Sequence, residues 1–276
     1  MPEGNTVWLT ARKLREALAG HPLITGELRI SELATSDLRG RTITEVVPRG
    51  KHLLMRFDNE LTLHSHLRMD GTWRVQPAGK PVRDLHDHVR AVLGNATSTA
   101  IGDRIHDIAL IPTSAEGTLV GHLGPDLLGP DWNAAEATRR IMADPRRSIG
   151  EALLDQRNLA GVGNVFKAET CFLRGLSPFT PVGDISDIAA VVDVAHRLLR
   201  ANRERYDHVT TGDTRAGQRT WVYDRAGKPC RRCGAPIQVA WQGATEQARV
   251  SYWCQNCQPG PDPAPAQRGV QRQPRP

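Results

Sequence analysis

The feature that most constrains the fold is a set of four cysteines near the end of the chain. They are spaced Cys230-x2-Cys233-x20-Cys254-x2-Cys257. Two CxxC pairs are typical of a structural zinc site, in which four thiolates complete a tetrahedral shell and leave no position open for chemistry. A redox role for one pair is the alternative, but it leaves the second pair unexplained. We therefore predict a zinc finger over residues 229–258, with one structural zinc ion per chain.

The span between the cysteine pairs is predicted to be a β-hairpin, with strands at Ile237–Trp241 and Arg249–Trp253. Both runs contain the β-branched and aromatic residues that favour strands. Arg249 lies near the hairpin tip, and Arg231 and Arg232 lie in the first cysteine pair. Arginines in these places suit contacts with phosphate groups.

One cysteine is left over, and the composition leaves few other classes open. Cys171 stands alone and is predicted to be a buried thiol. The 276 residues, 39% hydrophobic and 24% charged, fit a globular chain with one large domain, or with two modest domains and a small module. No apolar run could span a membrane, and none precedes Arg12 and Lys13 as a signal sequence, so we expect a cytoplasmic protein.

The charge of the chain is uneven. Residues 1–133 contain 15 Lys and Arg against 16 Asp and Glu, a net charge of −1, whereas residues 134–276 contain 21 against 14, a net charge of +7. A basic half favours a polyanionic partner, most simply nucleic acid. A generally arginine-rich proteome is the alternative explanation.

The chain starts with Met1, Pro2 and Glu3. Removal of Met1 would leave Pro2 as the terminal residue, with a secondary amine that can attack an aldehyde carbon and form an iminium ion. Glu3 could donate and accept protons beside it. The motif is too short to be specific by itself, because many chains begin this way.

A helix is predicted directly after this start. Asn5 or Thr6 would cap it and Gly20 would end it. The positive end of the helix dipole would disfavour a protonated amine at Pro2 and favour the neutral nucleophile. The residues at apolar helical spacing are Val7, Ala11, Leu14 and Leu18.

Residues 21–121 consist mostly of short alternating runs separated by turn signals, which favours a β-sandwich or barrel. Strands are predicted at Leu23–Ile30, Thr42–Val47, His52–Phe57, Leu61–Leu67, Thr72–Gln76, His88–Leu93, Thr97–Ile101, Ile105–Ile111 and Thr118–Val120.

Two turns in this region carry candidate site residues. Lys51 follows the Arg49-Gly50 turn at the start of a strand, where a lysine is commonly only solvated. Arg68 and Met69 lie at a hairpin tip, before an Asp-Gly turn. A methionine at an exposed tip is unusual for a core residue, but it suits an apolar wedge that enters a base stack.

The second half of the chain is predicted to be helical. Residues 122–132 are rich in Gly and Pro and are predicted to link two domains. Helices are predicted at Ala134–Met142, Ile149–Gln156, Val165–Leu173 and Asp187–Glu204.

A glycine-containing turn joins the second and third of these helices. Gly161 and Gly163 allow the backbone to approach a partner closely, and Asn164 is predicted to cap the next helix and to point its amide outward. This arrangement can bind a phosphate. An ordinary turn between helices is the alternative.

Taken in order, these motifs resemble the formamidopyrimidine-DNA glycosylase / endonuclease VIII family, and within it the actinobacterial endonuclease VIII branch. The resemblance covers about residues 1–258. Its motifs are Pro2-Glu3-Gly4, RGKHLL around Lys51, SHLRMDGTW at 65–73, HLGPDLLGPDW at 122–132, LLDQRNLAGVGNVFKAE at 153–169 and the four-cysteine motif.

The resemblance implies an α+β multidomain fold with damaged double-stranded DNA bound between its domains. It implies a monomer that associates with the nucleoid through DNA. The expected parts are a β-sandwich domain with a leading helix at 1–121, a linker at 122–132, a helix–two-turn–helix domain at 133–228 and a zinc-finger hairpin at 229–258. Outside the resemblance, residues 259–276 are rich in Pro, Gln, Gly and Arg without apolar periodicity, which predicts a disordered tail.

The resemblance also implies roles for residues in the first half. Pro2 would be the nucleophile at the sugar C1′, and Glu3 would shuttle protons. Lys51 matches a family lysine that contacts phosphate and assists catalysis. Met69 falls where family members fill the gap left by a flipped nucleotide, and Arg68 adjoins it.

In the second half, Asn164 matches the phosphate-binding asparagine of the turn. Arg249 matches the finger arginine that holds the phosphates flanking the lesion. Glu169 matches a family carboxylate with a supporting role. The implied enzyme is a bifunctional DNA glycosylase and abasic-site lyase of base excision repair, which forms a Schiff base, cleaves by β- or β,δ-elimination and needs no redox or nucleotide cofactor.

Two departures from the family pattern affect this expectation. Thr6 stands where many members have a glutamate. The set Leu67-Arg68-Met69 differs from the best-known endonuclease VIII pattern, and Met69 resembles the oxidised-purine branch. The Pro-Glu-Gly start favours oxidised pyrimidines as substrates. The alternatives are a non-catalytic damage-recognition protein of the same fold and a general zinc-ribbon adaptor for nucleic acids.

Overall fold

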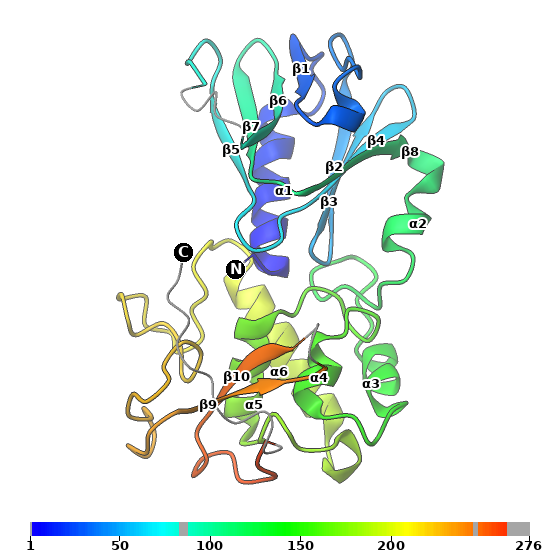
Figure 1. Ribbon diagram of the computed structural model, residues 1–276. Coiled ribbons are helices and arrows are strands. Elements are labelled where there is room, and N and C mark those ends of the chain that lie inside the picture. The colour runs from blue at the N-terminus through cyan, green and yellow to red at the C-terminus, as the bar shows by residue number, and fades with distance from the viewer. Residues whose placement is uncertain (1, 83–87, 245–247, 264–276) are drawn as a thin grey trace. The chain divides into compact units, whose positions relative to one another are not determined.

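The structure is a computed structural model that describes residues 2–82, 88–244 and 248–263. The chain divides into two compact units, a first unit at Met1–His122 and a second unit at Leu123–Pro276, and each is considered by itself (Figure 1). Most of the tail predicted at 259–276 lies outside the described residues. None of the helices in the described ranges is long and apolar enough to cross a membrane.

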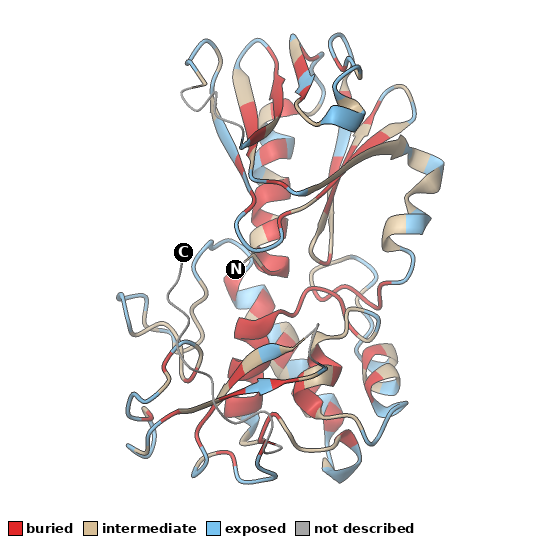
Figure 2. Cartoon of the chain, viewed as in Figure 1, coloured by how far each residue is buried: buried red, intermediate tan, exposed pale blue. Residues whose placement is uncertain are grey.

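The first unit is a β-sandwich with a leading helix, as the sequence predicts. Helix α1 (Gly4–Leu18) packs against strands of both sheets, and its apolar face is buried in the core between them (Figures 1 and 2). One antiparallel sheet has the order β1 (Thr25–Leu28), β6 (Val89–Gly94), β7 (Ser98–Asp103) and β5 (Thr72–Pro77), and the other has β2 (Ile43–Arg49), β3 (His52–Phe57), β4 (Leu61–His66) and β8 (Asp107–Pro112).

Two local predictions in the first unit are wrong. The strand predicted at Thr118–Val120 is part of helix α2 (Gly117–Val120), which follows the 3-10 turn η2 (Thr113–Ala115). Three residues are too few to distinguish the periodicity of a helix from that of a strand. The helical conformation begins at Glu116, whose side chain forms an ion pair with Arg56 of β3. Helix α1 starts at Gly4 because Glu3 is its extended N-cap residue, so neither predicted cap is used. A further 3-10 turn, η1, spans Ser31–Leu33.

The described part of the second unit contains four main helices and a hairpin. The apolar faces of the helices form one core, and the hairpin forms a smaller core against α5. The elements are α3 (Ala134–Met142), α4 (Ile149–Leu154), α5 (Asn164–Arg174), the 3-10 turn η3 (Val182–Asp184), α6 (Ile188–Asn202), and the antiparallel strands β9 (Gln238–Gln242) and β10 (Arg249–Trp253).

The segment predicted as a linker, 122–132, is largely packed onto the second unit. Leu123 and Leu127 are buried, and Asp126 forms a parallel bridge with Ala160. Gly124 lies so close to the backbone that an added Cβ would be 2.5 Å from the Arg157 carbonyl oxygen. The glycines here serve close packing as well as turning, and the segment belongs to the second unit from Leu123 onward.

Candidate active site and nucleic-acid interface

The predicted nucleophile precedes helix α1 in the first unit. Pro2 is half-buried and Glu3 is fully buried. The Glu3 carbonyl accepts the Val7 N–H at 3.1 Å, but its side chain makes no cap hydrogen bond to the helix. The carboxylate is therefore not used as a helix cap.

Lys51 lies in the tight turn between β2 and β3. Arg49 and His52 are directly paired, so Gly50 and Lys51 are the two central residues, and Gly50 has φ of 57°. A positive φ at the first central position is typical of a type II′ hairpin turn and favours glycine. Lys51 is half-buried. This turn lies at the same end of the first unit as the start of α1 (Figure 1).

The loop that follows β4 presents Met69, whose surface is 63% exposed. Arg68 takes a positive φ of 51° and forms an ion pair with Asp107, the first residue of β8. Gly71 closes the loop by donating its N–H to the Leu67 carbonyl at 2.9 Å. The loop is therefore closed on itself by the Gly71–Leu67 hydrogen bond and tied to the sheet by the Arg68–Asp107 ion pair.

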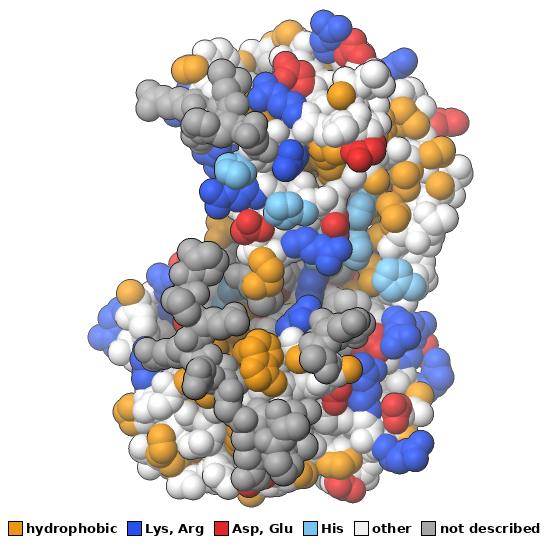
Figure 3. Space-filling model, in the orientation of Figure 1, with side chains coloured by type: hydrophobic (Ala, Val, Ile, Leu, Met, Phe, Trp, Pro, Cys, Tyr) orange, Lys and Arg blue, Asp and Glu red, His pale blue; other side chains and the backbone are white. Residues whose placement is uncertain are grey.

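A group of histidines, which the sequence analysis missed, lies beside these residues. His52 is paired across the strands with His66, and His52 Nδ1 lies 2.8 Å from His64 Nε2. The His122 ring contacts His52 edge-on at 6.4 Å between centroids. Figure 3 shows histidine side chains beside basic ones on the surface of the first unit. The only sequence signal was His64 and His66 at a spacing of two, which places both on one face of a strand.

His52, His64 and His66 are held neutral by burial. Desolvation is the main cause that lowers the pKa of His52 to about 3 and that of His66 to about 4, and it also lowers the pKa of His64. His66 Nδ1 accepts the Arg68 N–H at 3.1 Å, which requires an unprotonated nitrogen. A neutral His66 therefore helps to hold the Met69 loop.

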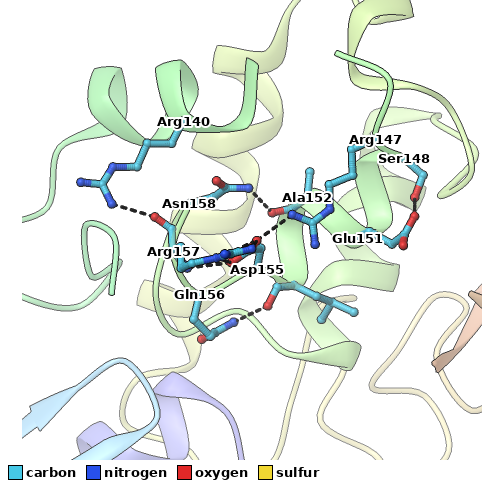
Figure 4. Close-up of polar contacts among 10 residues, drawn as sticks. Arg140, Arg147, Ser148, Glu151, Ala152, Asp155, Gln156, Arg157 and Asn158 are labelled. Atoms are coloured by element: carbon cyan, nitrogen blue, oxygen red, sulfur yellow. Dashed lines mark hydrogen bonds and ion pairs between the residues drawn. The ribbon is translucent and has the colours of Figure 1, made fainter. Parts of the chain in front are cut away.

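In the second unit, the turn between α4 and α5 is organised by its own side chains (Figure 4). Asp155 accepts from the guanidinium groups of Arg147 and Arg157, and their hydrogen bonds lower its pKa. The Gln156 amide donates to the Val162 carbonyl at 3.0 Å and accepts the Gly161 N–H at 3.0 Å. These contacts fix the turn before any ligand binds.

The sequence predicts that Asn164 points its amide outward, but its amide nitrogen points toward β10. Gly163 is the N-cap residue, and Asn164 is the first residue of α5. Its Nδ2 donates to the Val250 carbonyl of β10 at 2.8 Å, while its Oδ1 is buried without a hydrogen-bond partner. The hairpin packs on α5 and draws the side chain toward itself, which local sequence could not show.

The arginines of the finger have different surroundings. Arg249 is exposed at the start of β10. In contrast, Arg231 donates to the Thr220 carbonyl at 2.9 Å, and the Arg232 guanidinium lies 4.4 Å from the centroid of the Phe172 ring. Arg231 and Arg232 therefore stabilise the finger and its loop, and their contact with phosphates stays a prediction.

The four cysteines have the geometry of a zinc site. Their Sγ atoms all lie within 4.8 Å of one another, with 3.8 Å between Cys230 and Cys257 and 3.5 Å between Cys233 and Cys254. Tetrahedral zinc with Zn–S bonds of about 2.3 Å requires sulfur atoms about 3.8 Å apart. Within the described ranges, no other cluster of three or more potential ligands is this compact.

Two buried groups lie on α5. Glu169 is fully buried and accepts the N–H groups of Trp221, Val222 and Tyr223, at 2.8 to 2.9 Å, and the Thr210 hydroxyl. Burial raises the pKa of Glu169, while these donors act in the opposite direction. The carboxylate thus holds the loop between α6 and the finger. Separately, Cys171 is a buried thiol, as predicted, and burial raises its pKa to about 12.

The fold and the cysteine site agree with the protein family that the sequence matches. Residues 1–105 match the model of the formamidopyrimidine-DNA glycosylase N-terminal domain, and residues 123–211 match that of the formamidopyrimidine-DNA glycosylase H2TH domain. The chain belongs to the formamidopyrimidine-DNA glycosylase family.

Its relatives place it near the endonuclease 8 proteins. It is 51% identical to "Probable endonuclease 8 2" of Streptomyces coelicolor, over 97% of this chain and 98% of that protein. It is 46% identical to "DNA-(apurinic or apyrimidinic site) lyase Nei2" of Mycolicibacterium smegmatis, over 94% and 99%. "Endonuclease 8" of Escherichia coli is 33% identical, over 94% of this chain and 100% of that protein.

The fold is also similar to that of solved structures. One is the Lactococcus lactis Fpg (MutM) in complex with DNA that contains N7-benzyl-Fapy-dG. The TM-score is 0.76 at 24% identity, over 94% of this chain and 100% of that chain. At this identity the comparison establishes the fold only.

Proposed function

We propose that Pro2, once Met1 is removed, is the catalytic nucleophile of this chain. The chain is a DNA glycosylase and DNA-(apurinic or apyrimidinic site) lyase of base excision repair, as its family and relatives indicate. The observation that carries the proposal is the position of Pro2, next to the buried Glu3 and directly ahead of the 15-residue helix α1. The positive end of that helix favours a neutral amine over a protonated one.

The chemistry follows from a secondary amine at this position. The Pro2 nitrogen attacks the sugar C1′, the damaged base leaves, and loss of the ring oxygen from C1′ gives an iminium ion. The iminium ion acidifies the C2′ proton, which Glu3 or another base removes. The C3′–O bond then breaks and the DNA strand is cleaved by β-elimination.

DNA binding is assigned to residues in both units. In the first unit, Lys51 would contact a phosphate, and Arg68 and Met69 would enter the space left by the flipped nucleotide. In the second unit, the start of α5 at Asn164 and the exposed Arg249 would bind phosphates. The Asn164 Nδ2 donates to the Val250 carbonyl and its Oδ1 can only accept, so at this point the backbone N–H groups of the helix start would bind the phosphate.

Zinc fits the four cysteines, and we assign one ion per chain to them. The ion would fix the ends of the β9–β10 hairpin, on which Arg249 lies, and four thiolates leave no open coordination position. Its role would therefore be to keep the finger folded.

We propose oxidised pyrimidines as the favoured substrates. The Pro-Glu-Gly start supports this preference, and the exposed Met69 gives oxidised purines as the second candidate. Thr6, at the position of a family glutamate, has a buried hydroxyl without a hydrogen-bond partner. A carboxylate that positions the lesion is therefore absent at this point of the chain.

Borohydride trapping tests the nucleophile. The iminium ion is reduced to a stable protein–DNA crosslink, so the enzyme should crosslink to a duplex with one abasic site or one oxidised pyrimidine. Pro2→Gly should lose the crosslink, and Arg39→Ala, which changes only an exposed ion pair, should keep it.

The possible outcomes separate the candidate functions. A crosslink that persists in Pro2→Gly would overturn the assignment of Pro2. Tight binding of damaged DNA without any crosslink would favour a non-catalytic damage-recognition protein, and Thr6 would then be the first residue to restore to glutamate.

A further inference from the structure

Lys167 lies in the first turns of α5 and is fully buried. Burial removes water from its ammonium group, which is costly unless other groups accept its hydrogen bonds. The helix dipole also disfavours a positive charge near a helix start. The chain therefore holds a lysine where both its burial and the helix dipole oppose the charge.

The acceptors of Lys167 belong to the zinc-finger hairpin. Its Nζ donates to Ser251 Oγ at 2.7 Å and lies 3.4 Å from the Val250 carbonyl oxygen. The Asn164 amide donates to the same carbonyl at 2.8 Å. Two side chains of α5 thus hold the backbone of β10 directly after Arg249.

From Ser251, the chain of hydrogen bonds continues to Gln242 on strand β9 of the hairpin. Ser251 Oγ donates to Gln242 Oε1 at 2.7 Å, and Gln242 is the cross-strand partner of Arg249. Gln242 Nε2 donates in turn to the Pro178 carbonyl at 2.7 Å and to Ser148 Oγ at 2.9 Å. The residues around Arg249 are therefore fixed to the helices, while Arg249 itself is exposed.

We propose that Lys167 is a positioning residue for DNA binding, which locks β10 onto α5 so that Arg249 and the start of α5 bind the phosphate backbone together. The inference rests on the proposed function and extends it to a residue that does not touch DNA. Holding Arg249 in place reduces the freedom that is lost when it binds a phosphate.

Lys167→Met is a suitable variant because it removes the charge and keeps an unbranched side chain. Without Lys167, the Val250 carbonyl still accepts from Asn164, and the Ser251 hydroxyl still donates to Gln242. Replacing a buried charge by an apolar side chain is often neutral or stabilising when its surroundings stay satisfied. We expect the variant to keep one zinc per chain and to melt at the same temperature or higher.

A double-mutant cycle tests whether Lys167 acts through Arg249. Binding is measured in the Pro2→Gly background, which separates affinity from chemistry, with a duplex carrying one tetrahydrofuran abasic-site analogue. Lys167→Met should weaken binding by about tenfold when Arg249 is present and by less than about twofold in Arg249→Ala, because coupled residues are not additive. Ser251→Ala, which keeps the ammonium, should show a smaller effect in the same direction.

Three outcomes would overturn the inference. They are an equal loss in both Arg249 backgrounds, unchanged affinity in Lys167→Met, and a loss of zinc or a lower melting temperature in that variant. Failure of the proposed function is recognised separately, because the Pro2→Gly protein would then bind the abasic duplex no more tightly than an undamaged one.

Discussion

The two units of this chain hold their buried polar residues in opposite ways. In the first unit, the polar group beside the candidate site consists of histidines that burial keeps neutral, with the pKa of His52 lowered to about 3. In the second unit, the corresponding groups are a buried lysine and a buried carboxylate with four donors, together with a cluster of four cysteines of which two are buried.

The difference shows how each unit depends on its environment. Neutral imidazoles need no counter-charge. At acidic pH they become protonated, and a buried charged imidazolium destabilises the folded state. Thiolates and a buried carboxylate need fixed partners, so the second unit depends on a metal ion and on a complete set of hydrogen bonds. We therefore expect metal removal to affect the second unit, and acid to affect the first unit through its histidines.

The largest effect is expected from loss of the metal. Cys254→Ser should release the zinc and unfold the hairpin, because structural zinc contributes about 10 kcal/mol in small fingers. Metal analysis and hydrogen exchange of β9 and β10 measure this. Cys171→Ala, at a buried cysteine outside the cluster, should retain one zinc. A full zinc content and a protected hairpin in Cys254→Ser would contradict the assignment.

The next effect concerns the buried carboxylate. Glu169→Leu leaves the N–H groups of Trp221, Val222 and Tyr223 without their acceptor, at a cost of about 3 kcal/mol or more. Glu169→Gln keeps one acceptor oxygen and should lose less stability. Denaturant unfolding measures the difference. Equal stability of the two variants would show that the carboxylate does not hold this loop.

A smaller effect is expected from acid in the first unit. The unfolded chain protonates His52 near its ordinary pKa of 6.5, but the folded chain only near 3, so stability falls as the pH falls between these values. At about pH 5 the loss from His52 alone is about 2 kcal/mol.

The acid effect is measured by comparing unfolding at neutral and acidic pH. His52→Asn should lose part of the dependence between pH 6.5 and 3. His106→Asn, at a histidine whose side chain is 58% exposed, should keep it. If the stability of both variants depends on pH in the same way, the buried histidines are not the cause of the acid effect.

The smallest effect on stability is expected at the exposed tip of the first unit. Met69→Ala should change the free energy of unfolding by no more than about 0.5 kcal/mol, because the side chain is largely exposed. Borohydride trapping should fall in the same variant if Met69 fills the space left by the flipped nucleotide. Unchanged trapping would remove that role from Met69.

Several features could be predicted from sequence because they are local. The cysteine spacing predicts a compact ligand set, and the alternation in residues 21–121 predicts a sandwich, since both patterns depend on neighbours along the chain. The helix after Pro2 follows from apolar residues at helical spacing. The first residue of the helix could not be predicted in this way, because the choice of Glu3 as the N-cap residue depends on how the helix start packs.

The tertiary structure alone decided which polar residues meet. Asn164 and Val250 are 86 positions apart, and Lys167 and Ser251 are 84 apart, so no local pattern predicts that α5 binds β10. The group of His52, His64 and His66 likewise depends on the register of two strands. Sequence determined the elements and the metal ligands through short-range spacing, whereas burial, pairing and the neutral state of the histidines arise from long-range packing.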